Sequence, residues 1–252
     1  MRTRFVRTAN TLRFLGAIEA LQKRGAGEAC LVVVDGEPGL GKSHTAQWWA
    51  LTTGSLLLRA KAKTTPPWLM RELLGELGVQ PEHSFERMFR QAIDALAARS
   101  EAAQRDGVDF AIVLDEVDHV IRQRQVLETL RDISDMLEIP IVLVGMGRVR
   151  HGLTRYPQIA SRVAQYVQFE NAPVEDVRAL VDGLSEVPVA DNLVELVHSL
   201  AKGRMREVLE AIAAIERFGR RRAGETIDVA AMAGEALMND RATGRPMLVR
   251  AA

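Results

Sequence analysis

The strongest constraint on the fold is a set of four short apolar runs separated by segments with a helical pattern. The runs occupy residues 29–34, 55–60, 109–114 and 139–144. Each is nearly continuous and rich in leucine or β-branched residues, which is typical of parallel strands buried on both faces. A weaker run at 165–170 alternates between apolar and polar residues and predicts an edge or late strand.

Helical periodicity fills the segments between these runs. Apolar residues recur at steps of three and four over 69–77, 85–97 and 126–137. Strands that alternate with helices require crossover connections, and these produce an open parallel sheet. The sequence therefore predicts a three-layer α/β body over residues 1–172, with a five-stranded, mostly parallel sheet. Residues 1–28 are expected to supply an N-terminal helix and arm.

The pattern changes after residue 172. From 173 to 240 the periodic segments all have the helical spacing, which predicts a small helical domain. Residues 241–252 have no period and are expected to form a flexible tail. The formal net charge is zero, there is one cysteine, and no apolar run approaches the roughly 20 residues that span a bilayer. We therefore expect a cytoplasmic protein that does not contact a membrane.

A phosphate-binding motif directly follows the first apolar run. "GEPGLGKS" (36–43) matches G-x-x-x-x-G-K-[ST] between a predicted strand and a predicted helix. The glycines let backbone N–H groups turn toward phosphate oxygens, and Lys42 is expected to reach the β- and γ-phosphates of ATP. The Ser43 hydroxyl is expected to ligate Mg²⁺. The predicted nucleotide contacts are Gly36, Glu37, Pro38, Gly39, Leu40, Gly41, Lys42, Ser43 and His44.

Two carboxylates end the third apolar run, in "FAIVLDE". Asp115 is suited to holding Mg²⁺ together with Ser43. Glu116 is suited to polarising the water that attacks the γ-phosphate, because it adds a general base beside the metal. The pair favours ATP hydrolysis over nucleotide binding alone.

With these motifs and the helical C-terminal segment, the chain resembles the AAA+ ATPases. The resemblance implies an arginine that reaches the nucleotide of a neighbouring subunit, and Arg162 in "ASRV" is the candidate for this finger. It also implies a sensor-2 arginine, for which Arg206 in "GRMREV" is the candidate. Arginine grips phosphate oxygens at two points. The alternative is that either arginine forms an ordinary surface ion pair.

One departure from this family concerns the end of the fourth strand. The family commonly has a polar sensor-1 side chain there, whereas this chain has Gly145 and Met146. Neither can orient a water molecule through its side chain. Hydrolysis is then expected to be slow, to depend on a partner, or to recruit Arg148.

Within AAA+ proteins, "VLDEVDHV", "VLVGMGR" and the short C-terminal domain resemble the transposition regulators of the Mu B and TnsC type. That resemblance implies homo-oligomers or helical filaments on duplex DNA, which deliver target DNA to a transposase. The segment after the second run would track the phosphate backbone without reading bases. Its candidate DNA contacts are Arg59, Lys61, Lys63, Thr64 and Thr65.

Three alternatives remain open at this point. The segment "RAKAKTT" is also compatible with an exposed basic loop that has no binding role. A second group of similar sequences, the ExeA-type ATPases, implies an assembly motor of a secretion or envelope system without DNA binding. The departure at Gly145 is also compatible with a nucleotide-gated switch that turns over little.

Overall fold

The computed structural model describes residues 1–23, 25, 27–222 and 224–250. It divides into two compact units. The body unit comprises residues 13–37 and 42–169, and the C-terminal unit comprises residues 1–12, 38–41 and 170–252. The predicted boundary at 172/173 lies close to this division, but the N-terminal arm belongs to the C-terminal unit and not to the body.

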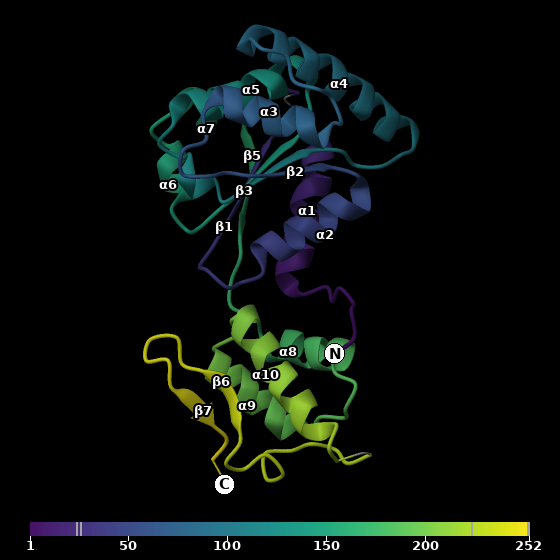
Figure 1. The fold of residues 1–252 in the computed structure, drawn as a ribbon, viewed down its shortest axis with the longest axis vertical. Helices are drawn as coiled ribbons and strands as arrows, with labels where there is room; N and C mark the ends of the chain where they lie inside the picture. The colour runs from purple at the N-terminus through teal and green to yellow at the C-terminus, as the bar shows by residue number, and fades with distance from the viewer. Residues whose placement is uncertain (24, 26, 223, 251–252) are drawn as a thin grey trace. The chain divides into compact units, whose positions relative to one another are not determined.

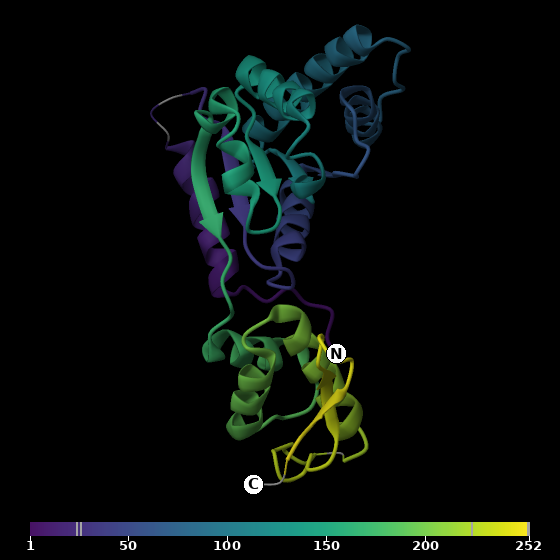
Figure 2. The same cartoon turned by 90° about the vertical axis from the view of Figure 1, so that its left-hand side faces the viewer.

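The body unit contains one five-stranded parallel sheet (Figures 1 and 2). Its strand order is β2-β3-β4-β1-β5, with every neighbouring pair parallel. The strands are β1 (Leu31–Asp35), β2 (Leu56–Arg59), β3 (Ile112–Asp115), β4 (Ile141–Val144) and β5 (Val163–Gln168). Each strand overlaps one of the five predicted runs, so the predicted fold class is confirmed.

Both faces of the sheet are covered, as the continuous apolar runs require. Leu31 and Val33 pack into a core with helices α3 (Pro66–Glu76), α4 (Phe85–Arg105) and α5 (Arg124–Leu137). The alternate residues of β1, Val32 and Val34, are equally buried but lie outside that cluster. Helix α2 (Lys42–Thr53) contacts β2, β3 and β4, and its Trp49 meets Phe14 of α1 (Ala9–Gln22) edge to face, with 5.5 Å between ring centroids.

Local sequence explains where two of these helices begin. The hydroxyl of Thr65 accepts the backbone N–H of Trp68, and two prolines occupy the first turn of α3. The hydroxyl of Ser84 accepts the N–H of Arg87 in the same way at the start of α4. Short elements complete the body: the 3₁₀ turn η1 (Val117–His119), α6 (Val149–Leu153) and α7 (Pro157–Ala160). Among the described residues, no helix is both long and apolar enough to cross a membrane.

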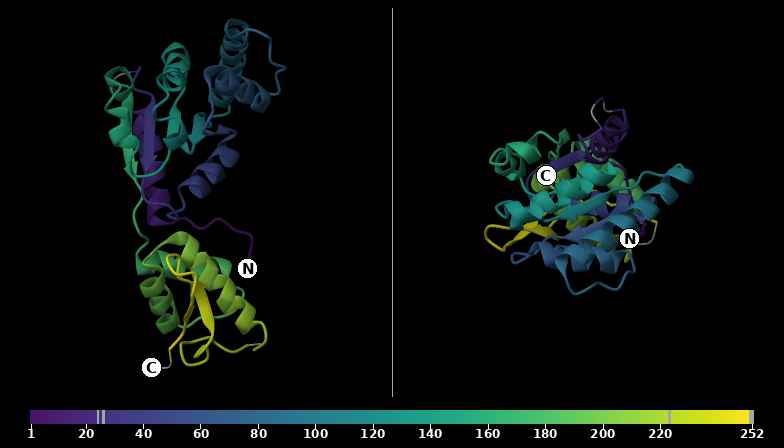
Figure 3. Two further views of the ribbon diagram at one scale, coloured as in Figure 1. Left: turned by 60° about the vertical axis from the view of Figure 1, so that its left-hand side comes forward. Right: turned by 90° about the horizontal axis from the view of Figure 1, so that it is seen from above.

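The C-terminal unit corrects the expectation of a purely helical domain with a flexible tail. It contains α8 (Val174–Leu184), α9 (Asp191–Ala201) and α10 (Met205–Gly219), followed by the antiparallel strands β6 (Ala236–Asn239) and β7 (Pro246–Leu248). Figure 3 shows this hairpin in yellow beside the green helices, and β6 contacts α10. Of the predicted tail, residues 251–252 lie outside the described residues.

Two kinds of contact hold the hairpin in place. Leu237 and Val249 are each only 2% exposed and belong to the core of the C-terminal unit. The guanidinium of Arg241 pairs with Glu207 at 3.2 Å and Glu210 at 2.7 Å, both on α10. Both kinds of contact join residues that are far apart in the sequence. A search for apolar residues at 3.6-residue spacing therefore could not predict the hairpin.

We predict that the hairpin contributes to stability through Leu237 and not through Leu248. Leu237→Ala should lower the free energy of unfolding of the C-terminal unit by about 2–5 kcal/mol, because it empties a buried site. Leu248→Ala, at a position that is 52% exposed, is the matched control and should change it by less than about 0.5 kcal/mol. Urea unfolding followed by circular dichroism measures both. Equal effects of the two substitutions would contradict a packed hairpin.

Candidate nucleotide site

The predicted phosphate loop joins the end of β1 to the first turn of α2. Gly39 and Gly41 have φ angles of +87° and +89°, in the left-handed region where a side chain is strained. Glycine is therefore favoured at both positions, because it follows this path without strain. The first backbone N–H groups of α2 have no partner within the helix and carry the positive end of its dipole, which makes this end of the helix suited to an anion.

Lys42 is buried, with 8% exposure, at the start of α2. Its ammonium donates hydrogen bonds to the carbonyls of Gly36 and Glu37, at 2.8 and 2.7 Å. Burial lowers the pKa of Lys42, and the charges of Asp118, Asp115 and Asp35 oppose that shift, Asp118 most strongly. The lysine thus lies in an acidic environment at the carboxyl edge of the sheet, held by carbonyls of its own loop.

Ser43 and Asp115 meet as the sequence predicts. The Ser43 hydroxyl donates to Oδ1 of Asp115 at 3.2 Å, and the backbone N–H of Glu116 donates to the same oxygen at 2.8 Å. Asp115 is 5% exposed. A hydroxyl and a carboxylate oxygen are hard donors of the kind Mg²⁺ prefers when phosphate oxygens and water complete its shell. Among the described residues, no group of three or more histidine, cysteine or acidic side chains is placed to hold a metal ion.

Glu116 has an unusual backbone conformation, with φ at +56°. A left-handed conformation is costly for a residue with a side chain and is often found at functional sites. Its carboxylate remains about half exposed; Arg59 Nε lies at 3.9 Å and His119 Nε2 at 3.6 Å. The turn thus leaves Glu116 at the open edge of the sheet beside buried Asp115, which suits a base that must reach a water molecule.

Arg59 was predicted to contact DNA from the loop after β2, but it lies within that strand. It is the last residue of β2 and is in register with Asp115 of β3. Its guanidinium lies 3.9 Å from Asp115 and 3.9 Å from Glu116, although 64% of the side chain is exposed. The structure therefore places Arg59 beside the predicted hydrolytic carboxylates.

The other candidate DNA contacts lie in the turn between β2 and α3. Lys63 is exposed, and Lys61 is exposed but forms an ion pair with Glu72 and lies 5.2 Å from the centre of the Trp68 ring. The structure corrects the prediction that Thr64 contacts DNA. Its side chain is 1% exposed, and its hydroxyl accepts the backbone N–H of Lys61. Its side chain holds the turn and is not available to a phosphate. Thr65 is exposed, but its hydroxyl caps α3.

Arg162 precedes β5 and is bound within its own chain. Its Nε lies 2.8 Å from Oδ1 of Asp135 on α5, and its Nη2 lies 3.3 Å from Oδ2 of the same carboxylate. These hydrogen bonds raise the pKa of Arg162, so the guanidinium stays charged. Two-point pairing of this type defines the direction of the side chain in a single subunit.

In the C-terminal unit, Arg206 lies in the first turn of α10. Its backbone N–H donates to the carbonyl of Gly39 at 3.2 Å. A methyl group at Gly39 would lie 3.7 Å from the Cβ of Arg206, and one at Gly41 would lie 3.6 Å from Met205. The sequence-predicted sensor-2 residue therefore adjoins the tip of the phosphate loop, residues 38–41, with which it shares a unit.

Two acidic residues near Lys42 had no assigned role in the sequence. Asp35 ends β1; its burial raises its pKa, and the backbone N–H of Arg150 and the charge of Lys42 act in the opposite direction. Asp118 lies in η1 and accepts the N–H of Met146 at 2.6 Å. The third acid of "LDEVD" was the available signal for Asp118, whereas Asp35 looked like a strand end.

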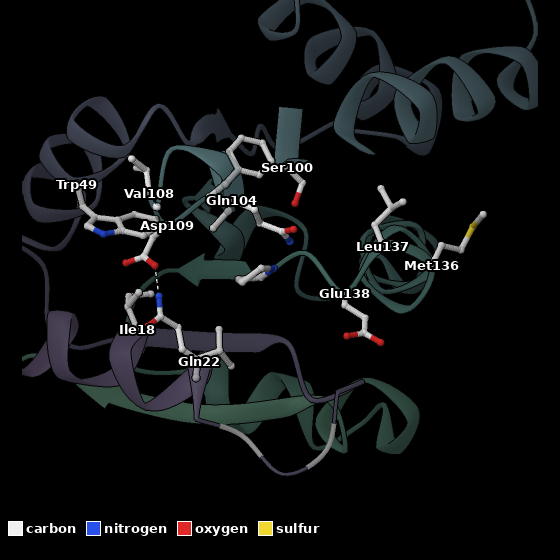
Figure 4. A pocket seen from close by; sticks show the side chains of 15 residues that line it. Ile18, Gln22, Trp49, Ser100, Gln104, Val108, Asp109, Met136, Leu137 and Glu138 are labelled. Carbon is white, nitrogen blue, oxygen red and sulfur yellow. Dashed lines mark hydrogen bonds between the residues drawn. The ribbon is translucent and has the colours of Figure 1, made fainter. Parts of the chain in front are cut away.

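A separate cavity of 720 Å³ lies at the other edge of the sheet (Figure 4). Phe110, Ala111 and Pro140, which precede β3 and β4, line it together with Trp49 and Met136. Gln22 donates to Asp109 across its mouth. Since the phosphate loop and Asp115 follow the strands, this cavity is not the nucleotide site.

Similarity to solved structures supports this arrangement at the level of the fold. The DNA complex of the Orc1 protein of Aeropyrum pernix is 18% identical with a TM-score of 0.55, over 87% of this chain and 61% of that one. The ADP form of the Orc2 protein of A. pernix is 13% identical with a TM-score of 0.61, over 90% and 68%. DNA-bound Drosophila ORC is 19% identical with a TM-score of 0.56, over 90% and 60%. The chain thus spans about two thirds or less of their length.

No curated protein matches the sequence. The sequence profile described as "AAA domain" matches residues 25–153, which is 129 of the 252 residues. This match begins before β1 and ends with α6, so it includes the phosphate loop, Asp115, Glu116 and the end of β4. This chain belongs to the AAA domain family.

Proposed function

We propose that this protein is an ATPase that binds duplex DNA through the DNA phosphate backbone, assembles on it as homo-oligomers or filaments, and regulates transposition by delivering target DNA to a transposase. The observation that carries the DNA-binding part is the exposed pair Lys61 and Lys63 in the turn after β2. The transposition part rests on the resemblance of "VLDEVDHV" and "VLVGMGR" to regulators of the Mu B and TnsC type.

Two solved structures with the same fold support DNA as the partner. The Orc1 protein of A. pernix is in complex with DNA, and Drosophila ORC is bound to DNA. Lysines in a turn contact phosphates without reading bases, so the proposed affinity is nearly independent of sequence and sensitive to salt.

ATP hydrolysis follows from the arrangement of the loop, the acid pair and the arginine. Lys42 exchanges loop carbonyls for phosphate oxygens, and Ser43 and Asp115 would hold Mg²⁺. When bound, the metal would neutralise charge on the phosphates. Glu116 orients the attacking water and accepts its proton. Arg162 of one subunit leaves Asp135 and contacts the nucleotide of the next, while Arg206 contacts the nucleotide of its own subunit.

A second candidate is a nucleotide-gated switch with little turnover, which the absence of a side chain at Gly145 favours. An assembly motor of the ExeA type is the third. Electron microscopy of the protein with ATP, with and without duplex DNA, distinguishes the ExeA-type assembly motor from the proposed DNA-binding regulator. Filaments that require DNA support the proposal, and rings or monomers that DNA leaves unchanged contradict it.

The acid pair and the finger can be tested together. Glu116→Gln should lower kcat by about 10²–10⁴-fold and leave affinity for a non-hydrolysable ATP analogue unchanged, because only the base is lost. Arg162→Ala should also lower kcat. A mixture of the two variants should regain turnover, since each Glu116→Gln subunit presents an intact Arg162 to an Arg162→Ala neighbour. Steady-state phosphate release measures this.

The outcome of that mixture separates the alternatives. No recovery in the mixture would contradict a finger that acts between subunits. A parent protein whose turnover stays as low as that of Glu116→Gln, with DNA present, would identify the switch.

We predict that substitutions in the turn after β2 change DNA affinity in opposite directions. Lys61→Ala and Lys63→Ala should each weaken binding of a duplex and lower the slope of log K against log salt by about one. Glu72→Gln should strengthen binding, because it removes the acid that pairs with Lys61. Fluorescence anisotropy across a salt series measures both effects.

Lys23→Ala is the matched control, because Lys23 is an exposed lysine paired with Glu19 far from this turn in the sequence. It should leave affinity and slope unchanged. If Lys61→Ala, Lys63→Ala and Glu72→Gln all bind DNA like the parent, the turn is not the site.

A further inference from the structure

The carboxylate of Glu207 lies beside the tip of the phosphate loop. Glu207 is in the first turn of α10, and its Oε2 lies 3.7 Å from the point that a Cβ on Gly39 would occupy. The preceding residue, Arg206, donates its backbone N–H to the carbonyl of the same glycine. The loop tip and this helix turn belong to one unit, so the contact is internal to that unit. An anion is thereby fixed beside a segment that is predicted to bind phosphates.

This carboxylate is buried and only partly satisfied. The Glu207 side chain is 12% exposed, and across the residues that the structure describes no group donates a hydrogen bond to its Oε2. Removing a charge from water is costly unless a partner compensates it, and salt screens a buried charge poorly. The positive end of α10 offsets part of the charge. The remainder repels an anion at Gly39, so nucleotide binding there requires a cation close to Glu207.

The β6–β7 hairpin supplies that cation. The Nε of Arg241 donates to Oε1 of Glu207 at 3.2 Å, and its Nη2 donates to Oε1 of Glu210 at 2.7 Å. Local hydrogen bonds fix the turn that carries Arg241, because the carboxylate of Asp240 accepts the backbone N–H of Thr243 at 2.7 Å. A short turn with a defined shape therefore presents the guanidinium to α10.

We propose that Arg241 is a positioning residue for the nucleotide, which neutralises Glu207 and thereby allows the phosphate loop to accept a phosphate beside Gly39. The inference rests on the proposed ATP binding at residues 36–43 and adds a determinant of its affinity. Arg241 acts through the carboxylate with which it pairs, so it does not have to touch the nucleotide. The affinity of the loop for ATP thus depends on a hairpin that is far from the loop in the sequence.

The first expected result concerns the loss and recovery of affinity. Arg241→Gln should weaken binding of a non-hydrolysable ATP analogue by about three- to tenfold, because one uncompensated charge then lies near the phosphates. The double variant Arg241→Gln/Glu207→Gln should return to within about twofold of the parent, since the anion beside Gly39 is gone. Glu207→Gln alone should bind the analogue as tightly as the parent or more tightly.

Glu210 provides the matched control. It lies on the same helix and pairs with the same guanidinium, but only Arg206 and Glu207 come within 4 Å of a Cβ at Gly39. The double variant Arg241→Gln/Glu210→Gln has the same formal charge as the variant that carries Glu207→Gln. It should nevertheless keep the weak binding of Arg241→Gln, because the carboxylate beside the loop remains.

Isothermal titration calorimetry of the full chain with the analogue and Mg²⁺ measures these affinities, and a melting temperature is recorded for each variant. The three proteins with Arg241→Gln lose the same contacts of the hairpin, so their melting temperatures should fall alike while their affinities differ. Parent-like affinity in Arg241→Gln would overturn the proposal. So would equal affinities in the two double variants, because Arg241 would then serve only the structure. Phosphate release by the parent tests the proposed ATPase separately, so the two proposals can fail independently.

Discussion

The parallel pairing of β4 with both β1 and β3 is the constraint on which the nucleotide site depends. Residues Ile141–Val144 of β4 are in register with Leu31–Val34 of β1, and its first three residues are also in register with Ile112–Leu114 of β3. Parallel strands end at the same edge of a sheet. The segments after these three strands therefore meet there, although they are far apart in the sequence.

Each of those segments supplies a different chemical group to that edge. The loop after β1 supplies backbone N–H groups and Lys42. The end of β3 and the turn after it supply three carboxylates, and the glycine directly after β4 leaves space for one of them. Because the central strands are buried on both faces, their ends have little freedom to move apart. The rigid sheet therefore fixes the positions of the charged groups at this edge.

Sequence patterns predicted the body well because its determinants are local. Runs such as "LVVV" and "IVLV" identify buried parallel strands by composition, and the spacing of Gly36, Gly41, Lys42 and Ser43 identifies an anion-binding loop by itself. The meeting of Ser43 and Asp115 was predictable for a second reason. Asp115 ends β3, the loop that leads to Ser43 follows β1, and parallel strands end at the same edge of a sheet.

Other features depend on contacts that no short pattern encodes. Leu237 and Val249 pack in the same core although they lie twelve residues apart, on the two sides of a hairpin. The sequence of this segment therefore shows no regular spacing of apolar residues. Thr64 has the side chain of a phosphate donor, and only the tertiary structure buries it. Gly145 looked like the loss of a functional group. A Cβ at this position would lie 2.6 Å from Oδ2 of Asp118, and that contact joins the segments after two different strands.

The hydrogen bonds of Lys42 have a consequence for how nucleotide affinity is set. The lysine donates to two loop carbonyls, so contact with a phosphate would exchange one set of hydrogen bonds for another and would not simply add new ones. Its net contribution to affinity is the difference between the two sets. Residues that determine how well the loop carbonyls satisfy Lys42 would therefore tune affinity without touching the nucleotide. Glu37 accepts the hydrogen bond of Lys42 through its backbone carbonyl. At this position the backbone conformation is therefore expected to affect nucleotide affinity more than the side chain does.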